Sequence, residues 1–183
     1  MAQVLNQLAT KSVVRTISPI DGGVYTEREL DNLGDINAVL SAAEAAQKKW
    51  QDVPLATRTQ YLEKALDALL SNKDAIAREI TQQMGRPISQ SAGELRGLEE
   101  RARYMMDIAP SALADVVPEQ KNGFKRFIKR VPLGVVAIVA PWNYPYLTSV
   151  NGIFPALLAG NAVVLKHSHQ TPLVADRYAE AFA

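Results

Sequence analysis

The sequence predicts an α/β protein in which a helical N-terminal region precedes the first, incomplete part of a parallel β-sheet. Two observations predict this fold class. Between residues 35 and 110, apolar side chains recur at intervals of three and four, the period of an amphipathic helix. After residue 133, two short β-branched runs, 135–140 and 162–165, are separated by enough chain for one crossover helix. That arrangement is typical of a βαβ unit, followed here by a further helical segment.

Composition limits the classes of partner. The 183 residues are 48% hydrophobic and 21% charged, as in an ordinary globular protein, and 20 basic residues balance 19 acidic ones. This balance favours a small-molecule partner over nucleic acid or a membrane surface. The N-terminal residues resemble no secretion signal and no apolar run reaches membrane-spanning length, so we expect a cytoplasmic protein.

Cysteine is absent, and His167 and His169 are the two histidines. The composition therefore excludes disulfides, thiolate metal sites and a cysteine nucleophile within these residues, and we expect no metal site.

The N-terminal third predicts a leader and one helix. Residues 1–33 are expected to be extended, with one short strand around 13–17 and turn chemistry in the SPIDGG segment at 18–23. A helix should follow with Asp35 as its N-cap. We expect it to bury one face formed by Ile36, Val39, Ala43, Ala46 and Trp50.

Three more helices are expected before residue 110. The first follows Pro54, and the second spans about 72–84 and ends at Gly85. The third begins near Ser89 and stops at Pro110, with Glu94 and the other charged residues mostly off its apolar stripe. This stripe is interpreted as core packing, with a ligand-pocket role for Met105 as the alternative. The expected buried positions of the three helices are Leu62, Ala65, Leu66, Leu69, Ile76, Ile80, Leu95, Leu98, Ala102, Met105 and Ala109.

In the C-terminal third, the spacing of the apolar residues is no longer that of a run of amphipathic helices. A turn at Asn122-Gly123 should introduce an exposed or edge strand over 124–131, with alternating basic residues. A strand at 133–140, a loop at 141–144, a helix at 145–158, a strand at 161–166 and a helix from Leu173 should follow. This last helix reaches Ala183 without a cap or breaker, so we expect the sequence to be truncated within an element.

Four polar residues come just after the two predicted parallel strands: Asn143, Lys166, Ser168 and His169. Ligands of open parallel sheets bind beyond the carboxyl ends of the strands, so these residues mark the expected site. Each residue alone is more typical of a turn or a solvated strand end. No G-x-G-x-x-G, P-loop, G-x-S-x-G or H-E-x-x-H motif is present.

The segments PLGVVAIVAPWNYP and PALLAGNAVVLKHSHQTPL resemble the cofactor-binding segment of the NAD(P)-dependent aldehyde dehydrogenase superfamily. AAQKKW, the region around Arg58 and QMGRPI resemble its helical N-terminal part. The resemblance implies a Rossmann-like sheet, here incomplete. It divides the chain into a leader and helical part (1–122), a strand bridging subunits of a homo-oligomer (123–132) and the start of the cofactor-binding sheet (133–183).

The same resemblance implies roles for individual residues. Asn143 would be catalytic, donating its side-chain amide to the oxygen of the tetrahedral intermediate. Lys166 would hydrogen-bond the adenosine ribose. The cofactor cleft would also include Val139, Ala140, Pro141, Trp142, Ser168 and His169, and the substrate tunnel would be near Tyr144, Thr148 and Asn151.

His169 departs from the family pattern. Many NAD-preferring members have an acidic residue three positions after the lysine, where it accepts from the ribose 2′-hydroxyl and repels a 2′-phosphate. His169 brings no negative charge, so we expect reduced discrimination between NAD and NADP.

The absence of cysteine is the larger departure, because the family's nucleophile is a cysteine. The favoured hypothesis is the N-terminal portion of an enzyme that oxidises an aldehyde to a carboxylic acid with NAD or NADP, inactive as these 183 residues alone. The alternatives are a noncatalytic truncated protein that binds nucleotide or self-associates, and an unrelated dinucleotide-binding domain. The last is disfavoured because no phosphate-cradling glycine loop follows the first strand.

Overall fold

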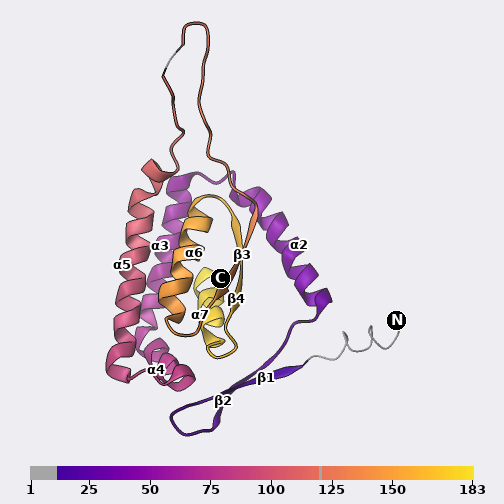
Figure 1. Ribbon diagram of the computed structural model, residues 1–183, viewed down its shortest axis with the longest axis vertical. Helices are drawn as coiled ribbons and strands as arrows, with labels where there is room; N and C mark the ends of the chain where they lie inside the picture. Colours follow the sequence, from indigo (N-terminus) through magenta and orange to yellow (C-terminus); the bar gives the residue numbers. More distant parts are fainter. Residues whose placement is uncertain (1–11, 120) are drawn as a thin grey trace, which may run out of the picture.

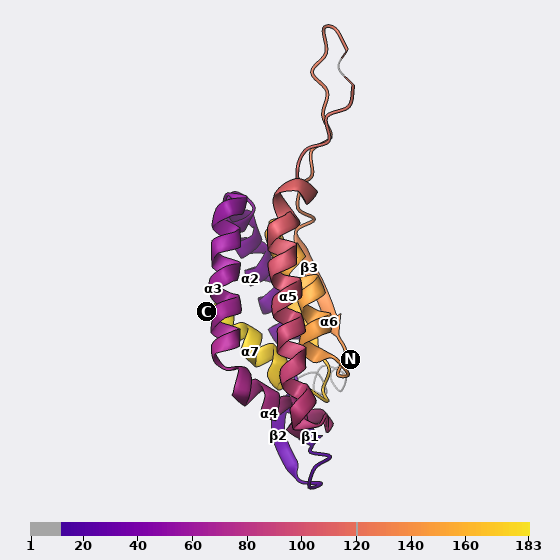
Figure 2. The same ribbon diagram turned by 90° about the vertical axis from the view of Figure 1, so that its left-hand side faces the viewer.

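A computed structural model describes residues 12–119 and 121–183 (Figures 1 and 2). The leader expected over residues 1–11 lies outside the described residues. In chain order the elements are β1 (Val13–Ile17), β2 (Val24–Glu29), α2 (Leu33–Trp50), α3 (Leu55–Ser71), α4 (Lys73–Met84), α5 (Ile88–Ala112), β3 (Val135–Ala140), α6 (Pro145–Leu158), β4 (Ala162–His167) and α7 (Leu173–Phe182).

The predicted βαβ unit is confirmed. β3 and β4 are parallel neighbours, α6 is the crossover, and α7 follows. α6 approaches the sheet closely at Gly152, where an added Cβ would lie 3.0 Å from Ile138 Cδ1. Asn161 fastens the start of β4 to the start of β3, because its Oδ1 accepts the N–H groups of Leu133 (2.6 Å) and Gly134 (3.0 Å).

The hydrophobic core lies on the helical side of the sheet, among α3, α4, α5, α6 and α7 (Figure 2). The predicted buried faces of α3 and α4 are confirmed. Gly85 ends α4 in the left-handed region at φ 78°, as expected. The fully buried core side chains include Leu62, Leu66, Leu69, Ile76, Ile80, Leu98, Val150, Phe154, Leu158 and Val174.

The N-terminal segment forms two antiparallel strands, β1 and β2, where one strand was predicted. β2 was missed because residues 24–29 read VYTERE, a polar run without apolar alternation. The hairpin docks on the end of the sheet, since Thr16 Oγ1 donates to the carbonyl of His169 at 2.9 Å and Arg28 pairs with Asp176 on α7.

The prediction for α2 was wrong in two respects. Its N-cap is Asn32, whose side chain accepts from Gly34 and Asp35, while Asp35 completes a capping box from the N3 position. The expected buried face is largely exposed, with Ile36 46% and Val39 48% accessible. The physical reason is that α2 stands beside a sheet of only two strands, which covers little of the helix (Figure 1).

Helix α5 also differs from expectation. It passes through Pro110 to Ala112, because the N–H of Leu113 still reaches the carbonyl of Ala109 at 2.9 Å. Met106 is the buried methionine, whereas Met105 is half-buried. Glu94, expected off the apolar stripe, is only 4% exposed.

The described residues between 114 and 132, here called the arm, extend away from the body (Figures 1 and 2). The strand expected over 124–131 does not form in this chain. The described part of the arm contains only the isolated bridges Val116–Ile128 and Lys121–Phe124. A strand needs a neighbour for its backbone groups, and the arm has no adjacent sheet.

Candidate cofactor and active site

Val139 and Lys166 lie side by side on the outer face of the sheet. They are register partners in the parallel β3–β4 pair, and parallel partners project to the same face. Val139 is 76% exposed and Lys166 is also exposed. The sheet therefore offers an open apolar surface beside a cation at the carboxyl ends of its strands.

The next register pair, Ala140 and His167, projects to the opposite face and is buried. The ring of His167 joins three segments, with Nε2 3.3 Å from the carbonyl of Pro145 and Nδ1 3.1 Å from Thr171 Oγ1. The carbonyl of Pro145 can only accept, so Nε2 carries the hydrogen. Burial lowers the pKa of His167. Ala140, expected in the cofactor cleft, thus faces α6.

The loop after β4 carries Ser168 and His169. Ser168 Oγ accepts the N–H of Gln170 at 3.2 Å, so the hydroxyl shapes the turn. The His169 side chain is exposed, while its carbonyl accepts from Thr16. The backbone of His169 is therefore anchored, and its imidazole is exposed to solvent near the end of β4.

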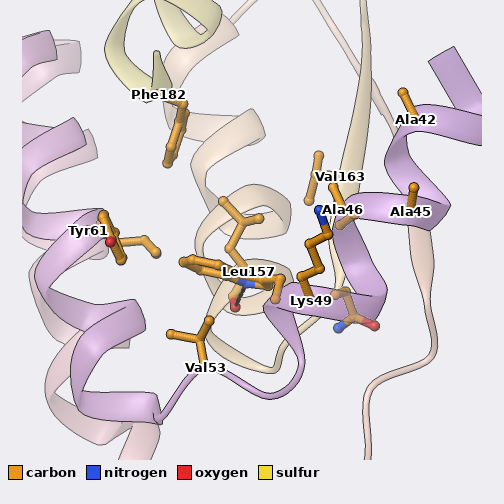
Figure 3. Close-up of a pocket in the computed structure, with 13 residues that line it drawn as sticks. Ala42, Ala45, Ala46, Lys49, Val53, Tyr61, Leu157, Val163 and Phe182 are labelled. Atoms are coloured by element: carbon orange, nitrogen blue, oxygen red, sulfur yellow. Dashed lines mark hydrogen bonds between the residues drawn. The ribbon is translucent and has the colours of Figure 1, made fainter.

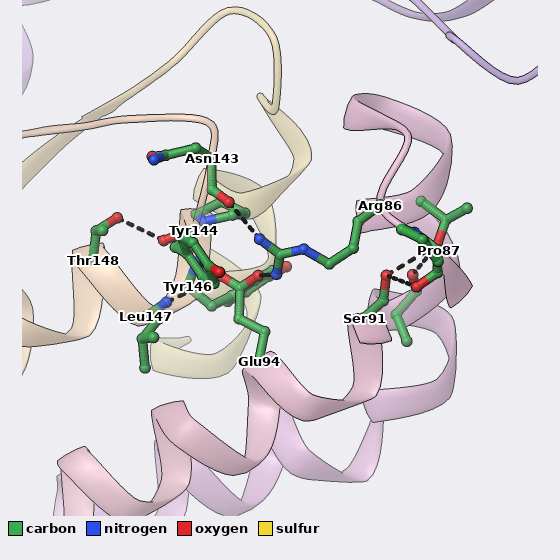
Figure 4. A network of polar contacts seen from close by, with 12 residues as sticks. Arg86, Pro87, Ser91, Glu94, Asn143, Tyr144, Tyr146, Leu147 and Thr148 are labelled. Atoms are coloured by element: carbon green, nitrogen blue, oxygen red, sulfur yellow. Dashed lines mark hydrogen bonds and ion pairs between the residues drawn. The ribbon is translucent and has the colours of Figure 1, made fainter. Parts of the chain in front are cut away.

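The loop after β3 presents Pro141, Trp142 and Asn143, all exposed. Arg86, from the α4–α5 connection, donates to the carbonyl of Asn143 (Figure 4). Within the described ranges, no residue forms a hydrogen bond with the Asn143 side-chain amide. In Figure 4 this amide points away from Arg86, so it remains available as a donor.

Glu94 reaches the same loop from α5. Its Oε1 accepts the N–H groups of Tyr146 (2.8 Å) and Leu147 (3.2 Å), the first free amides of α6, and its Oε2 pairs with Arg86 (Figure 4). Burial raises the pKa of Glu94, against the lowering effect of the two amides and Arg86. Because this carboxylate already occupies the start of α6, these amides are not open to a cofactor phosphate.

Sequence reasoning missed both Glu94 and Arg86. Glu94 lies three residues after buried Ser91 and four before Leu98, which is the spacing of the apolar face. That spacing could have predicted its burial. No comparable signal marks Arg86, whose contacts are 8 and 57 residues distant in the chain.

The expected tunnel residues gather at the start of α6. Tyr144 is exposed and its ring lies under the Arg86 guanidinium, 4.4 Å from ring centroid to Cζ. Thr148 Oγ1 and Asn151 Nδ2 donate to the carbonyls of Tyr144 (2.7 Å) and Leu147 (3.1 Å). Both polar side chains therefore bond to their own helix.

A separate apolar cavity of about 700 Å³ lies between α2, α3, α6 and the start of β4 (Figure 3). Ala46, Lys49, Tyr61 and Leu157 are among its lining residues. It adjoins Ala162 and Val163, at the opposite end of β4 from Lys166, and so lies away from the edge where parallel sheets bind ligands.

The described residues contain no group of three His, Asp or Glu side chains arranged to hold a metal ion. None of the helices in these residues combines the length and apolar character needed to cross a bilayer.

A parallel βαβ unit with polar and charged side chains at the carboxyl ends of its strands defines an α/β protein of the Rossmann-like class. More specifically, the chain belongs to the aldehyde dehydrogenase family, whose model matches residues 7–183. The fold resemblance is confirmed by solved structures of family members.

Two curated relatives illustrate the match. The chain is 30% identical to D-glyceraldehyde dehydrogenase (NADP(+)) of Picrophilus torridus over 92% of its length and 34% of the relative. It is 35% identical to malonate-semialdehyde dehydrogenase of Bacillus cereus over 90% of its length and 34% of that protein. The chain thus spans about a third of these relatives.

Two solved structures also resemble this chain over most of its length. PnpE in complex with nicotinamide adenine dinucleotide matches with a TM-score of 0.87 at 30% identity, covering 93% of this chain and 35% of that one. Succinic semialdehyde dehydrogenase from Streptococcus pyogenes, in complex with NADP+, matches with a TM-score of 0.84 at 27% identity, covering 93% and 38%.

Proposed function

We propose that this chain supplies the adenosine-binding surface and the oxyanion donor of an NAD(P)-dependent aldehyde dehydrogenase, which oxidises an aldehyde to a carboxylic acid. The observation that carries the proposal is the pairing of exposed Lys166 with exposed Val139, one loop away from the free amide of Asn143. The relatives that use NADP, or whose structures contain NAD or NADP, support it.

The residues fit the adenosine end of such a cofactor. The Lys166 ammonium has three donors for ribose hydroxyls, and Val139 offers an apolar surface to the flat base. The bound dinucleotide would accept the hydride in the oxidation. Because Glu94 occupies the start of α6, we propose that the pyrophosphate is held by residues other than the amides of Tyr146 and Leu147.

Asn143 would donate its amide to the aldehyde oxygen as negative charge develops there. Loss of one such donor typically costs about 2.7–4 kcal/mol of transition-state stabilisation. The nucleophile must come from outside this sequence, which contains no cysteine. We therefore propose that the 183 residues alone do not turn over an aldehyde.

His169 bears on the choice of cofactor. Its exposed side chain comes three positions after Lys166, where many NAD-preferring family members carry an acidic residue, so we propose reduced discrimination between NAD and NADP.

Nucleotide binding tests this function directly. In a Trp50→Phe background, Trp142 is the remaining tryptophan, and its fluorescence is titrated with NADP and with NAD. We expect saturable quenching by both, with affinities reduced about tenfold by Lys166→Ala, the loss expected for charge-assisted hydrogen bonds. His169→Glu should weaken the binding of NADP more than the binding of NAD.

Lys48→Ala, an exposed lysine on α2, is the matched control and should leave both affinities unchanged. Absence of saturable quenching, or equal affinities in Lys166→Ala and the parent, would refute the proposed site. Formation of NAD(P)H from an aldehyde by the purified chain would refute its inactivity.

The arm favours a second candidate function, a self-associating noncatalytic module. All described residues from 114 to 131 are exposed, and they include several large apolar side chains. We propose that the arm pairs with a second copy of this chain, which would satisfy its backbone groups and cover Phe124, Phe127 and Ile128.

A further inference from the structure

We propose that Arg86 and Glu94 are positioning residues for Asn143, holding its loop so that the side-chain amide faces the aldehyde oxygen. This proposal rests on the proposed function of Asn143 as the oxyanion donor. Neither residue is adjacent to Asn143 in sequence, and both come from the helical N-terminal part of the chain.

Arg86 contacts the loop at two residues and is itself paired with Glu94 on α5. One guanidinium nitrogen, Nη1, pairs with Glu94, and the other, Nη2, donates to the backbone carbonyl of Asn143. The guanidinium also lies over the ring of Tyr144, the residue after Asn143, at 4.4 Å (Figure 4). The guanidinium fork can serve two acceptors in different directions, which a lysine ammonium does less well.

Glu94 holds the other side of the loop. Its Oε1 accepts the first two free N–H groups of α6, at Tyr146 and Leu147, while its Oε2 receives Arg86. Asn143 is therefore held at its own carbonyl by Arg86, and the helix that starts two residues later, at Pro145, is held by Glu94. Its backbone is restrained, and its amide remains unpaired.

The arrangement exceeds what helix capping requires. Capping α6 needs only an acceptor for its first amides, and Tyr144 at the N-cap supplies none from its side chain. The bond from Arg86 to the Asn143 carbonyl contributes nothing to that cap. It fixes the residue that would carry the donor, and preorganised donors are those that stabilise developing charge.

Arg86 has an electrostatic role as well. An uncompensated carboxylate near the loop would oppose negative charge on a bound aldehyde oxygen. The side chains of Glu94 and Arg86 are 0% and 10% exposed, so their opposite charges are in direct contact with little water between them. The guanidinium therefore neutralises the carboxylate that caps α6.

The test measures loop order in the 183-residue chain with Trp50→Phe, so that Trp142, adjacent to Asn143, is the reporter. Acrylamide quenching of Trp142 and NMR relaxation of the Asn143 side-chain amide are recorded for Arg86→Lys, Arg86→Ala and Glu94→Gln. Amide exchange of Tyr146 and Leu147 reports the cap separately. Glu99→Gln, an exposed ion-pair residue on the same helix, is the control.

We expect Arg86→Lys to increase Trp142 quenching and Asn143 side-chain motion while leaving the melting temperature and the Tyr146 amide close to the parent. Glu94→Gln should also accelerate exchange at Tyr146 and Leu147, by about tenfold for loss of a charge-assisted bond. Added guanidinium ion, but not equal sodium chloride, should restore the parent quenching in Arg86→Ala.

Parent-like quenching and relaxation in Arg86→Lys would overturn the proposal, as would absence of guanidinium rescue in Arg86→Ala. Nucleotide titration of the same samples separates this result from the proposed function. If the parent binds neither NAD nor NADP, the proposed function fails while the loop measurements still decide whether Arg86 and Glu94 position Asn143.

Discussion

Glu94 Oε1 lies 2.8 Å from the backbone nitrogen of Tyr146, which is 52 residues further along the chain. A carboxylate on α5 thus caps α6, and the two helices are packed so closely that a Cβ on Gly97 would approach Leu147 Cδ1 to 2.9 Å. The stability of the helical region and the geometry of the Asn143 loop consequently depend on the same contact.

Replacement of Glu94 by alanine should strongly destabilise the fold. It leaves two amides of α6 without their acceptor and Arg86 as a nearly buried charge without its partner. We expect a loss of about 3–5 kcal/mol in the free energy of unfolding, the usual cost of removing one partner of a buried pair. Urea unfolding followed by circular dichroism measures it.

Glu99→Ala on the same helix is the control for that experiment. Glu99 forms an exposed ion pair with Arg103, so its removal should change the unfolding free energy by less than about 1 kcal/mol. Similar losses at both positions would mean that the cap from Glu94 is not a major contribution.

His167 should make stability dependent on pH. Burial lowers its pKa from the ordinary 6.5, so below that pH the unfolded chain binds a proton that the folded chain resists. The unfolding free energy should therefore fall as the pH drops from 7.5 to 5.5, by at most about 1.4 kcal/mol per pH unit from this group.

The His167→Gln variant isolates this effect. Its unfolding free energy should fall less than that of the parent between pH 7.5 and pH 5.5. Glu94, whose pKa is raised, acts in the opposite sense and is unchanged in both proteins. Identical profiles for His167→Gln and the parent would contradict the assignment.

Two glycine-to-alanine changes should have opposite signs. Gly160 has φ 87°, and a Cβ there would lie 3.1 Å from Arg58 Nη1 and 3.4 Å from the backbone Cα of Gln51. We expect Gly160→Ala to cost about 1–2 kcal/mol from the left-handed conformation alone. Gly93→Ala lies inside α5 with only an ordinary contact, at 3.5 Å from Arg96 Nη2, and should stabilise by about 0.5–1 kcal/mol. Chemical denaturation of both variants measures the difference, and a neutral Gly160→Ala would contradict the strain argument.

The features that were predictable from sequence are those with a local period. Leu62, Leu66 and Leu69 define a buried helical face because the structure keeps the 3.6-residue repeat that their spacing indicates. The two β-branched runs likewise predicted a parallel pair, and with it the proximity of the loops carrying Asn143 and His169.

Features that depend on distant contacts were not predictable. Ile36 and Val39 carry the pattern of a buried face, yet whether a face is covered depends on what packs against it, and here two strands are too few. Asn161 at the start of β4, and His167 and Glu94 at the site, act through bonds to segments 22 to 53 residues away, which no local pattern specifies.

The arm offers the last prediction. Phe124, Phe127 and Ile128 are 61%, 52% and 63% exposed, and the backbone pairing of their segment within the described residues is limited to the isolated bridges Val116–Ile128 and Lys121–Phe124. If a second copy covers them, Phe124→Ser with Ile128→Ser should weaken association by at least about 2 kcal/mol, roughly thirtyfold, because each buried side chain contributes about 1.5–3 kcal/mol. Sedimentation equilibrium measures the change. Tyr104→Ser, which removes an aromatic side chain 63% exposed on α5, is the control and should associate like the parent. A monomeric parent, or equal association of parent and arm variant, would refute pairing through the arm.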